Sequence, residues 1–240
     1  MKKYIFMFVL ITIIVVIRLF NHFKSSKVYG TVIILNGPSA SGKSSIQKEF
    51  QYLMMRQPLS KGEVYPEQSR GDGMAKLWIK LGIDNLFDKP MPDINLENMK
   101  FWQSKNDIRW IETTKDKNDN SIITLFTGQE GQKVAFGMNS AIAEYAKNGC
   151  NVIVDYIAYK KEWLDDLKKK LKNVKTYWVK VNIPLNVLEE REVARGTSPK
   201  GHARSHYDYV YWDLKYDLEV NSDKASAKEI AEQIKNHFKL

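Results

Sequence analysis

Residues 37–44 read Gly37-Pro38-Ser39-Ala40-Ser41-Gly42-Lys43-Ser44 and directly follow the apolar run Thr31-Val32-Ile33-Ile34-Leu35-Asn36. The octapeptide fits the pattern GxxxxGKS, and the run before it is typical of a buried strand. Glycine at 37 and 42 permits the close approach and the dihedral angles of a loop whose backbone N–H groups point inward at a polyphosphate. The stretch therefore predicts a phosphate-binding loop between a strand and a helix.

The residues after this loop supply the other groups of a nucleotide site. An amphipathic pattern predicts a helix from Ser44 to about Arg56, whose first N–H groups and dipole favour an anion. We expect Lys43 to reach the β and γ phosphates of ATP and the Ser44 hydroxyl to hold Mg²⁺. The predicted nucleotide-binding residues belong to the loop and the first helical turn: Gly37, Ser39, Ala40, Ser41, Gly42, Lys43, Ser44 and Ser45.

Length and composition limit the classes to which the chain can belong. The 240 residues are 43% hydrophobic and 27% charged, which suits one sizeable α/β core. The net charge is +9, but residues 1–29 hold five basic and no acidic residues, so the rest carries +4. No basic tract is interleaved with aromatic residues, and we expect no nucleic-acid partner. The single cysteine excludes an intrachain disulfide, and the four histidines lack the spacing of a zinc site.

The N-terminal segment differs in character from the rest. Residues 4–17 are apolar apart from one threonine and are flanked by Lys2-Lys3 and Arg18. No small-x-small cleavage site follows, and with the next few residues the run is long enough for a short membrane span. We therefore predict a single membrane anchor within residues 1–29, which holds residues 30–240 in the cytoplasm, where ATP is available. Export is the alternative, and the segment is then a signal-like sequence.

Apolar runs alternate with amphipathic segments along residues 30–240, which is the pattern of a parallel sheet covered by helices on both faces. We predict an α/β fold of three layers around a five-stranded parallel sheet. Ser226 and Glu229 form a capping-box pattern at the start of the last helix. The predicted strands are 31–36, 79–83, 152–155, 174–181 and 218–220, and the later helices are 134–148, one around 163–167, 184–196 and one from 226 onward.

Three segments fall outside these layers. The polar stretch 57–74 contains several glycines and predicts a loop or a mobile insertion. Residues 110–114 and 122–127 flank a turn-rich stretch and predict a small β-hairpin on the substrate side. Residues 197–204 are polar and suit a flexible lid that closes over the site and excludes water.

Two predicted strands end in an aspartate at the edge of the sheet where open α/β proteins bind ligands. Asp155 follows a β-branched run, and we expect it to hold Mg²⁺ directly or through water; a helix N-cap is the alternative. Asp84 ends the neighbouring strand, where its carboxylate can accept the proton of a hydroxyl aimed at the γ phosphate. The alternative for Asp84 is a turn or cap residue.

Two arginines lie four residues apart on the helix before Gly196. Arg191 and Arg195 therefore project from one face toward the predicted lid. Arginines in such a place can neutralise the charge on a transferring phosphoryl group. The alternative is that they pair with the acidic residues of the same helix, Glu189, Glu190 and Glu192.

Six segments between residues 30 and 240 occur together in one order: residues 32–44, Gly82-Ile83-Asp84, the hairpin from Trp110 to Thr127, Ile153-Val154-Asp155, Arg191-Glu192-Val193-Ala194-Arg195-Gly196 and Tyr216-Asp217-Leu218-Glu219-Val220. With these segments the chain resembles the chloramphenicol phosphotransferase family of P-loop kinases. The resemblance implies an adenylate- or shikimate-kinase-like scaffold that uses ATP and Mg²⁺ to phosphorylate a hydroxyl of a small antibiotic. It gives Asp84 the general-base position, Lys43 the phosphate position, Arg191 and Arg195 the lid side, and residues 221–224 a loop near the adenine.

These observations predict an ATP-dependent kinase that transfers the γ-phosphoryl group to a hydroxyl of a small molecule, such as chloramphenicol or a related compound. The catalytic residues would be Asp84, Lys43, Arg191 and Arg195, with Ser44 and Asp155 at the metal. One alternative is a membrane-anchored nucleotide-binding switch without kinase activity. Another is a nucleoside or shikimate-type kinase, which changes the acceptor and not the mechanism.

Overall fold

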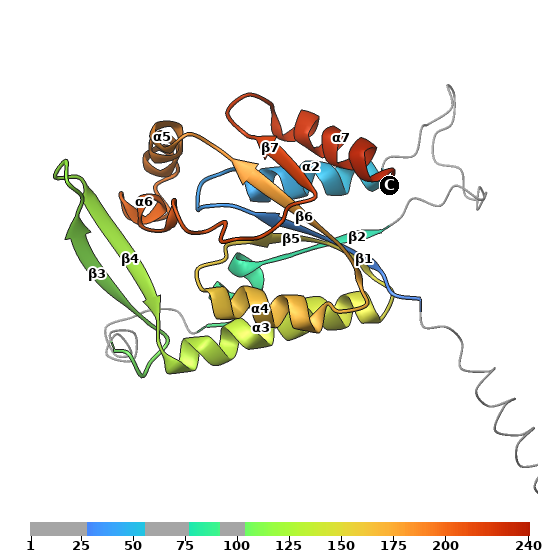
Figure 1. The fold of residues 1–240 in the computed structure, drawn as a ribbon, viewed down its shortest axis with the longest axis horizontal. Helices are drawn as coiled ribbons and strands as arrows, with labels where there is room; N and C mark the ends of the chain where they lie inside the picture. The colour runs from blue at the N-terminus through green and yellow to red at the C-terminus, as the bar shows by residue number, and fades with distance from the viewer. Residues whose placement is uncertain (1–27, 56–76, 92–103) are drawn as a thin grey trace, which may run out of the picture.

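A parallel sheet of five strands, in the order β2-β5-β1-β6-β7, lies at the centre of the computed structural model (Figure 1). The structure describes residues 28–55, 77–91 and 104–240. The middle strand is β1, which pairs in parallel with β5 and β6. The predicted five-stranded parallel sheet is therefore confirmed. Its strands are β1 (Thr31–Asn36), β2 (Trp78–Gly82), β5 (Asn151–Tyr156), β6 (Lys175–Asn182) and β7 (Leu218–Asn221).

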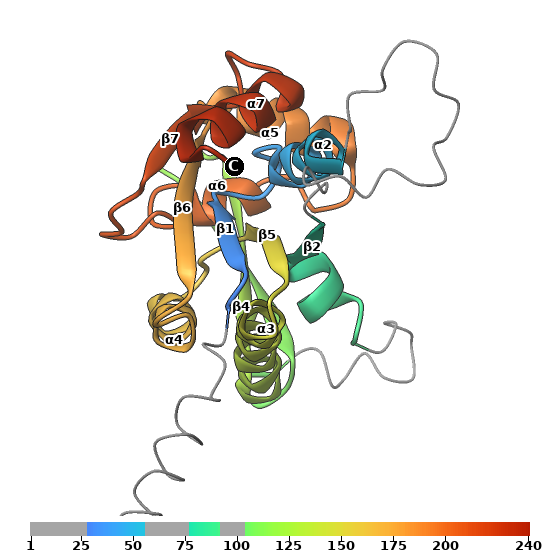
Figure 2. The ribbon, with the colours of Figure 1, turned by 90° about the vertical axis from the view of Figure 1, so that its right-hand side faces the viewer.

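Helices cover both faces of the sheet (Figure 2). Val32 and Ile34 of β1 pack on the side of α3 and α4, whereas Ile33 and Leu35 pack on the side of α2 and α7. Because the central strand buries both of its faces, a continuous β-branched run is favoured over an alternating one. The four helices are α2 (Lys43–Met55), α3 (Gln129–Lys147), α4 (Lys161–Lys170) and α7 (Ala227–Phe238).

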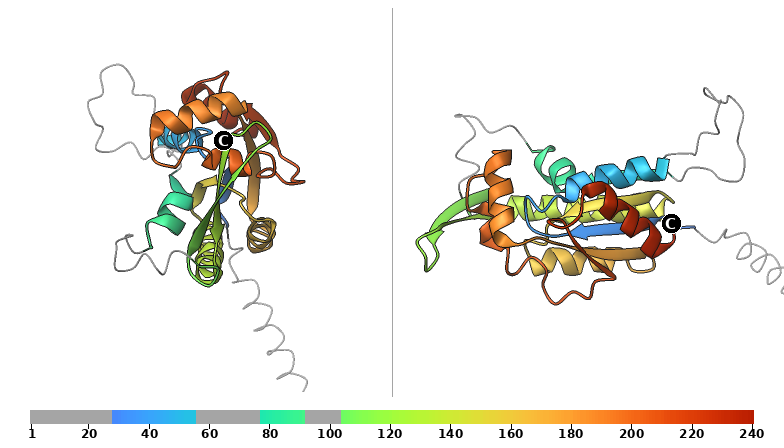
Figure 3. Two further views of the ribbon diagram at one scale, coloured as in Figure 1. Left: turned by 90° about the vertical axis from the view of Figure 1, so that its left-hand side faces the viewer. Right: turned by 90° about the horizontal axis from the view of Figure 1, so that it is seen from above.

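A hairpin and two helices lie beyond the carboxyl edge of the sheet (Figure 3). The hairpin consists of β3 (Arg109–Lys115) and β4 (Ser121–Thr127), as predicted. The helices are α5 (Leu185–Arg195) and α6 (His202–His206). The hairpin packs on the start of α6, where Ile123 donates its backbone N–H to the Gly201 carbonyl over 3.1 Å. The predicted flexible lid is thus partly helical and packed against the hairpin.

The start of helix α3 and the end of strand β2 differ from the prediction. Helix α3 begins at Gln129 instead of residue 134, because Gly131 lets it approach β3: a Cβ there would lie 2.1 Å from the Ile108 carbonyl oxygen. Strand β2 ends at Gly82, and Asp84 opens a single π-helical turn, η1 (Asp84–Asp88). Asp84 therefore comes just after the strand end instead of forming it.

The predicted membrane-anchored localisation needs correction. Among residues 28–55, 77–91 and 104–240, no helix is long and apolar enough to cross a bilayer. The apolar segment on which that prediction depended falls in residues 1–27, outside the described residues. The predicted insertion at 57–74 also lies outside the described residues.

Candidate active site

The phosphate-binding loop connects β1 to α2 at the carboxyl edge of the sheet (Figure 1). Gly42 has a φ of +90° and Ala40 a φ of +64°, so two left-handed residues curl the loop. Gly37 is needed for close approach, because a Cβ there would lie 2.8 Å from the Val181 carbonyl oxygen. The loop and the first turn of α2 contain every predicted nucleotide-binding residue, namely Gly37, Ser39, Ala40, Ser41, Gly42, Lys43, Ser44 and Ser45.

Lys43 is buried beneath the loop, with only 4% of its surface exposed. Its ammonium group donates to the Pro38 carbonyl over 2.8 Å and lies 3.5 Å from a carboxylate oxygen of Asp155. Burial lowers the pKa of Lys43, while the Asp155 carboxylate acts in the opposite direction. Among the residues described, Lys43 has a single carboxylate partner, so its buried ammonium group can also interact with a second anion, such as a phosphate.

Asp155 is the fifth residue of β5 and joins Lys43 to Ser44. The Ser44 hydroxyl donates a hydrogen bond to its carboxylate. The residue that precedes α4 at the N-cap is Lys160, so the alternative role of Asp155 as a helix cap does not apply. In the described part of the chain, no group of three or more His, Cys, Asp and Glu side chains could hold a metal alone.

Asp84 lines the same cleft, two residues after Gly82, which pairs with Asp155 in the sheet. Its side chain remains accessible from the cleft, and Asp88 lies one turn further along η1. Partial burial raises the pKa of Asp84, and the negative charges of Asp155 and Asp88 raise it further. Asp88 itself forms an ion pair of 2.9 Å with Arg109 of β3. The carboxyl group of Asp84 is therefore more basic than that of an ordinary surface aspartate.

Arg191 and Arg195 reach the loop from α5. Arg195 donates to the hydroxyl groups of Ser39 and Ser198 over 3.0 and 3.1 Å. Arg191 donates to the carbonyl oxygen of Ser222 over 2.7 Å, in the segment after β7. These hydrogen bonds go to serines instead of the acidic residues of α5, so the predicted alternative does not describe the two arginines.

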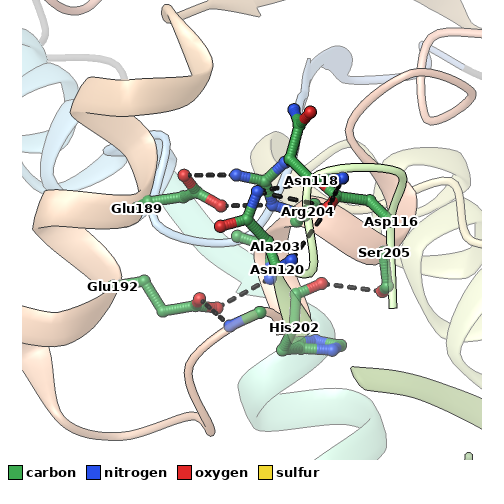
Figure 4. A network of polar contacts seen from close by, with 10 residues as sticks. Asp116, Asn118, Asn120, Glu189, Glu192, His202, Ala203, Arg204 and Ser205 are labelled. Atoms are coloured by element: carbon green, nitrogen blue, oxygen red, sulfur yellow. Dashed lines mark hydrogen bonds and ion pairs between the residues drawn. The ribbon is translucent and has the colours of Figure 1, made fainter. Parts of the chain in front are cut away.

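Two acidic residues of α5, Glu189 and Glu192, have other partners. Glu189 pairs with Arg204 of α6 over 2.5 Å. The fully buried carboxylate of Glu192 accepts the backbone N–H groups of Gly201 and Ala203 over 2.8 and 2.7 Å (Figure 4).

One cleft of about 1140 Å³ is lined by the predicted catalytic and metal-binding side chains: Lys43, Ser44, Asp84, Asp155, Arg191 and Arg195. Lys43, Ser44 and Asp155 line the cleft at the phosphate loop, and Asp84 opens η1, which the ion pair between Asp88 and Arg109 joins to the hairpin. Aromatic and apolar side chains from η1, β4, the segment after β5 and α4 also line the cleft: Phe87, Leu125, Phe126, Ile157, Tyr159 and Trp163. The cleft thus has a cationic part beside the loop and a more apolar part near Asp84.

A sequence profile of chloramphenicol phosphotransferase-like proteins matches residues 70–239, more than half of the chain. The chain belongs to this family. It is accordingly a phosphotransferase with the P-loop kinase fold. A Mycobacterium tuberculosis protein named "Putative O-phosphotransferase" is 25% identical over 217 residues, which cover 87% of this chain and 82% of that protein.

Solved structures support the fold of this chloramphenicol phosphotransferase-like protein. The APS kinase CysC of Mycobacterium tuberculosis, in complex with AMPPNP and APS, has a TM-score of 0.53 at 16% identity and covers 89% of this chain and 99% of its own. A tunicamycin resistance protein of Deinococcus radiodurans has a TM-score of 0.50 at 15% identity, over 88% of this chain and 96% of its own. At 15–16% sequence identity, this similarity shows a shared fold and nothing about the substrate.

Three polar residues of this family member were not predicted from the sequence. Gln47 on α2 donates to the carbonyl oxygens of Leu81 and Ile153 over 2.6 and 2.7 Å, and so joins the loop helix to β2 and β5. Glu192 and His206 hold the lid segment and the loop, respectively. Their roles depend on neighbours far away in sequence; the one local signal is the i, i+4 spacing of His202 and His206, which fits one face of a helix.

Proposed function

We propose that the domain formed by residues 30–240 transfers the γ-phosphoryl group of ATP to a hydroxyl group of a small molecule bound near Asp84. The observation that carries this proposal is the common cleft onto which Lys43, the Ser44–Asp155 pair and Asp84 open. A phosphate-binding loop alone would suit any nucleotide-binding protein. A carboxyl group with a raised pKa in the same cleft is what a transfer to an alcohol also needs.

The nucleotide is expected on the cationic side of the cleft. The backbone N–H groups of the loop and the N-terminus of α2 would surround its phosphates, with Lys43 close beneath them. Arg195 approaches the loop at Ser39 and can compensate charge that develops on the transferred group. Arg191 contacts Ser222, so the base of the nucleotide is expected near the segment after β7.

The oxygen atoms of Ser44 and Asp155 fit a magnesium ion that is bound together with the nucleotide. Mg²⁺ prefers hard oxygen ligands and takes only one or two from the protein, the rest coming from phosphates and water. A hydroxyl and a carboxylate in hydrogen-bond contact are such a pair. When bound, Mg²⁺ would neutralise phosphate charge, and Lys43 would turn from Asp155 toward the phosphates.

Asp84 is proposed as the general base. It would accept the hydroxyl proton of the acceptor while the hydroxyl oxygen attacks the γ phosphorus in line with the leaving ADP. Its raised pKa makes it a better proton acceptor than an ordinary aspartate. The apolar and aromatic wall near Asp84 suits an acceptor with an apolar body, and the family to which the chain belongs favours chloramphenicol or a related hydroxyl compound.

The test is the variant Asp84→Asn, assayed with labelled ATP against phenylpropanoid antibiotics, nucleosides and a metabolite extract. We expect transfer to fall by about 10²- to 10⁴-fold, as when a general base is removed, with little change in ATP affinity. Asp88→Asn is the matched control: it should retain transfer at high pH and shift the acid limb of kcat/KM to lower pH, because a charge that raises the Asp84 pKa is gone.

Two outcomes would contradict the proposal. Full transfer by Asp84→Asn would remove this residue from the base position. ATP hydrolysis that responds to no acceptor would favour a nucleotide-dependent switch over a kinase.

A further inference from the structure

Two buried histidines lie on α6, and one of them, His206, contacts the phosphate-binding loop. His206 has no exposed surface, and His202 has 3%. The Nε2 atom of His206 lies 3.0 Å from the backbone nitrogen of Ser39, inside the loop. Their rings lie 4.9 Å apart, and Tyr159 packs against both. Helix α6 therefore touches the loop through an imidazole ring.

The partners of these rings fix where the hydrogen atoms are. The Ser39 N–H can only donate, so Nε2 of His206 must accept, and its hydrogen is on Nδ1. That hydrogen faces the Ser205 hydroxyl, 3.3 Å away, which donates its own hydrogen to the His202 carbonyl and so has a lone pair free. The His202 ring has the same neutral tautomer. Its Nδ1 faces the Ile123 carbonyl oxygen, which can only accept, so its hydrogen is also on Nδ1.

The charged groups around His206 favour the neutral ring. Lys43 approaches it from the loop, and His202 lies beside it on α6. Arg195 of α5 donates to the hydroxyl of Ser39, the residue whose N–H His206 accepts. Burial is the largest cause that lowers the pKa of His206 well below its usual 6.5, and His202 and Lys43 lower it further. Glu192 holds the start of α6 by two backbone N–H groups (Figure 4), and the phenol of Tyr159 stays protonated because burial raises its pKa.

The contact between His206 and Ser39 matters because the next residue of the loop is strained. Ala40 has a φ of +64°, a conformation that costs an alanine about 1 kcal/mol or more. The Ser39 peptide just before it is held by His206 at its N–H, and the Ser39 hydroxyl is held by Arg195. A loop fixed at this point keeps its later N–H groups in the orientation that a phosphate requires.

We propose that His206 is a positioning residue of the phosphate-binding loop, which it holds through the Ser39 N–H only while its ring is neutral. This inference rests on the proposed function, since the ligand of the loop is taken to be a nucleotide. His206 contacts no reacting atom. It makes the phosphate site dependent on the docking of α6, and hence on the lid.

The experiment compares two variants of the full chain. His206→Leu removes the acceptor, and His206→Gln replaces it by an amide oxygen that does not titrate. Affinity for ATP with Mg²⁺ is measured by calorimetry between about pH 5 and 8, with the exposed His237→Gln as matched control. At neutral pH we expect about tenfold weaker binding for the Leu variant, because a buried N–H loses its partner. The Gln variant should bind within about threefold of the wild type and lack its loss of affinity in acid.

Kinetics separate positioning from general damage. The Leu variant should raise the KM for ATP and leave the KM for the acceptor unchanged. Wild-type affinity in a Leu variant whose circular dichroism matches the wild type would overturn the inference. So would a loss of ATP affinity in acid that is as large in the Gln variant as in the wild type.

If the wild type binds no nucleotide at any pH, the proposed function fails, and nitrogen NMR of the histidine rings decides the inference. His206 should then show hydrogen on Nδ1, and the Ser39 amide signal should move as this ring titrates. Hydrogen on Nε2 of His206 would overturn the inference.

Discussion

At the scale of single residues, Asp155 is the side chain whose loss should be most informative about the metal. It accepts the Ser44 hydroxyl and lies 3.5 Å from the Lys43 ammonium. Asp155→Asn keeps the shape and removes the charge. We expect half-maximal transfer to need at least about tenfold more Mg²⁺, because an oxygen ligand has lost its charge. Asp165→Asn, which breaks an exposed pair on α4, is the control, and an equal effect in both variants would contradict the assignment.

The same residues show what can be predicted from sequence alone. Lys43, Ser44 and Gly42 could be predicted because the chemistry of a phosphate loop fixes their spacing within eight residues. Asp155 could be located because a buried parallel strand must end at the ligand edge of the sheet. His206 could not, because its partner Ser39 lies 167 residues away, and the i, i+4 spacing of His202 and His206 does not distinguish a buried imidazole from a surface one.

At the scale of elements, Arg204 joins the hairpin to the lid. Its guanidinium group donates to both carboxylate oxygens of Glu189 on α5 and, over 2.8 Å, to Asp116 in the hairpin turn (Figure 4). Arg204→Met should release the hairpin, whose Leu125 and Phe126 line the cleft. We expect faster hydrogen exchange in residues 115–121 and a severalfold higher KM for the acceptor.

Two further variants test this coupling. Arg204→Lys keeps the charge but loses the planar fork, so its effect should be intermediate. Lys200→Met, a neighbouring exposed residue, should have none. Unchanged exchange in the hairpin of Arg204→Met would show that the backbone contact between Ile123 and Gly201 is sufficient by itself.

Helices and strands were predicted correctly where the local sequence pattern alone specifies the element. The hairpin alternates around a turn that Asp116 caps by accepting the N–H groups of Asn118 and Asn120. The predicted flexible lid, residues 197–204, includes the first residues of α6, whose five residues have no hydrophobic period. It is held from outside, by Glu192 on one side and by the hairpin on the other. Tertiary contacts of this kind leave no trace in local sequence.

At the scale of the whole molecule, apolar and ionisable groups are segregated. The two faces of the sheet carry the two main hydrophobic clusters, and the buried Lys43, His202 and His206 lie near the carboxyl edge. Burying such groups lowers stability at the pH values where they would be charged in water. The folded state keeps them because they hold the loop and the lid, so the site should contribute most of the pH dependence of folding near neutrality.

The two buried histidines should determine the sign of that pH dependence. Burial lowers the pKa values of His202 and His206 below 6.5, so as the pH falls through 6.5 the unfolded chain takes up protons that the folded chain excludes. The free energy of unfolding should therefore decrease below about pH 6.5, by at most about 1.4 kcal/mol per pH unit for each histidine, until the folded-state pKa is reached. Urea unfolding at several pH values should show this slope in the wild type and in His237→Gln. The double variant His202→Gln, His206→Gln should lose it, whatever its absolute stability, and an unchanged slope in that variant would mean that other groups determine the acid sensitivity.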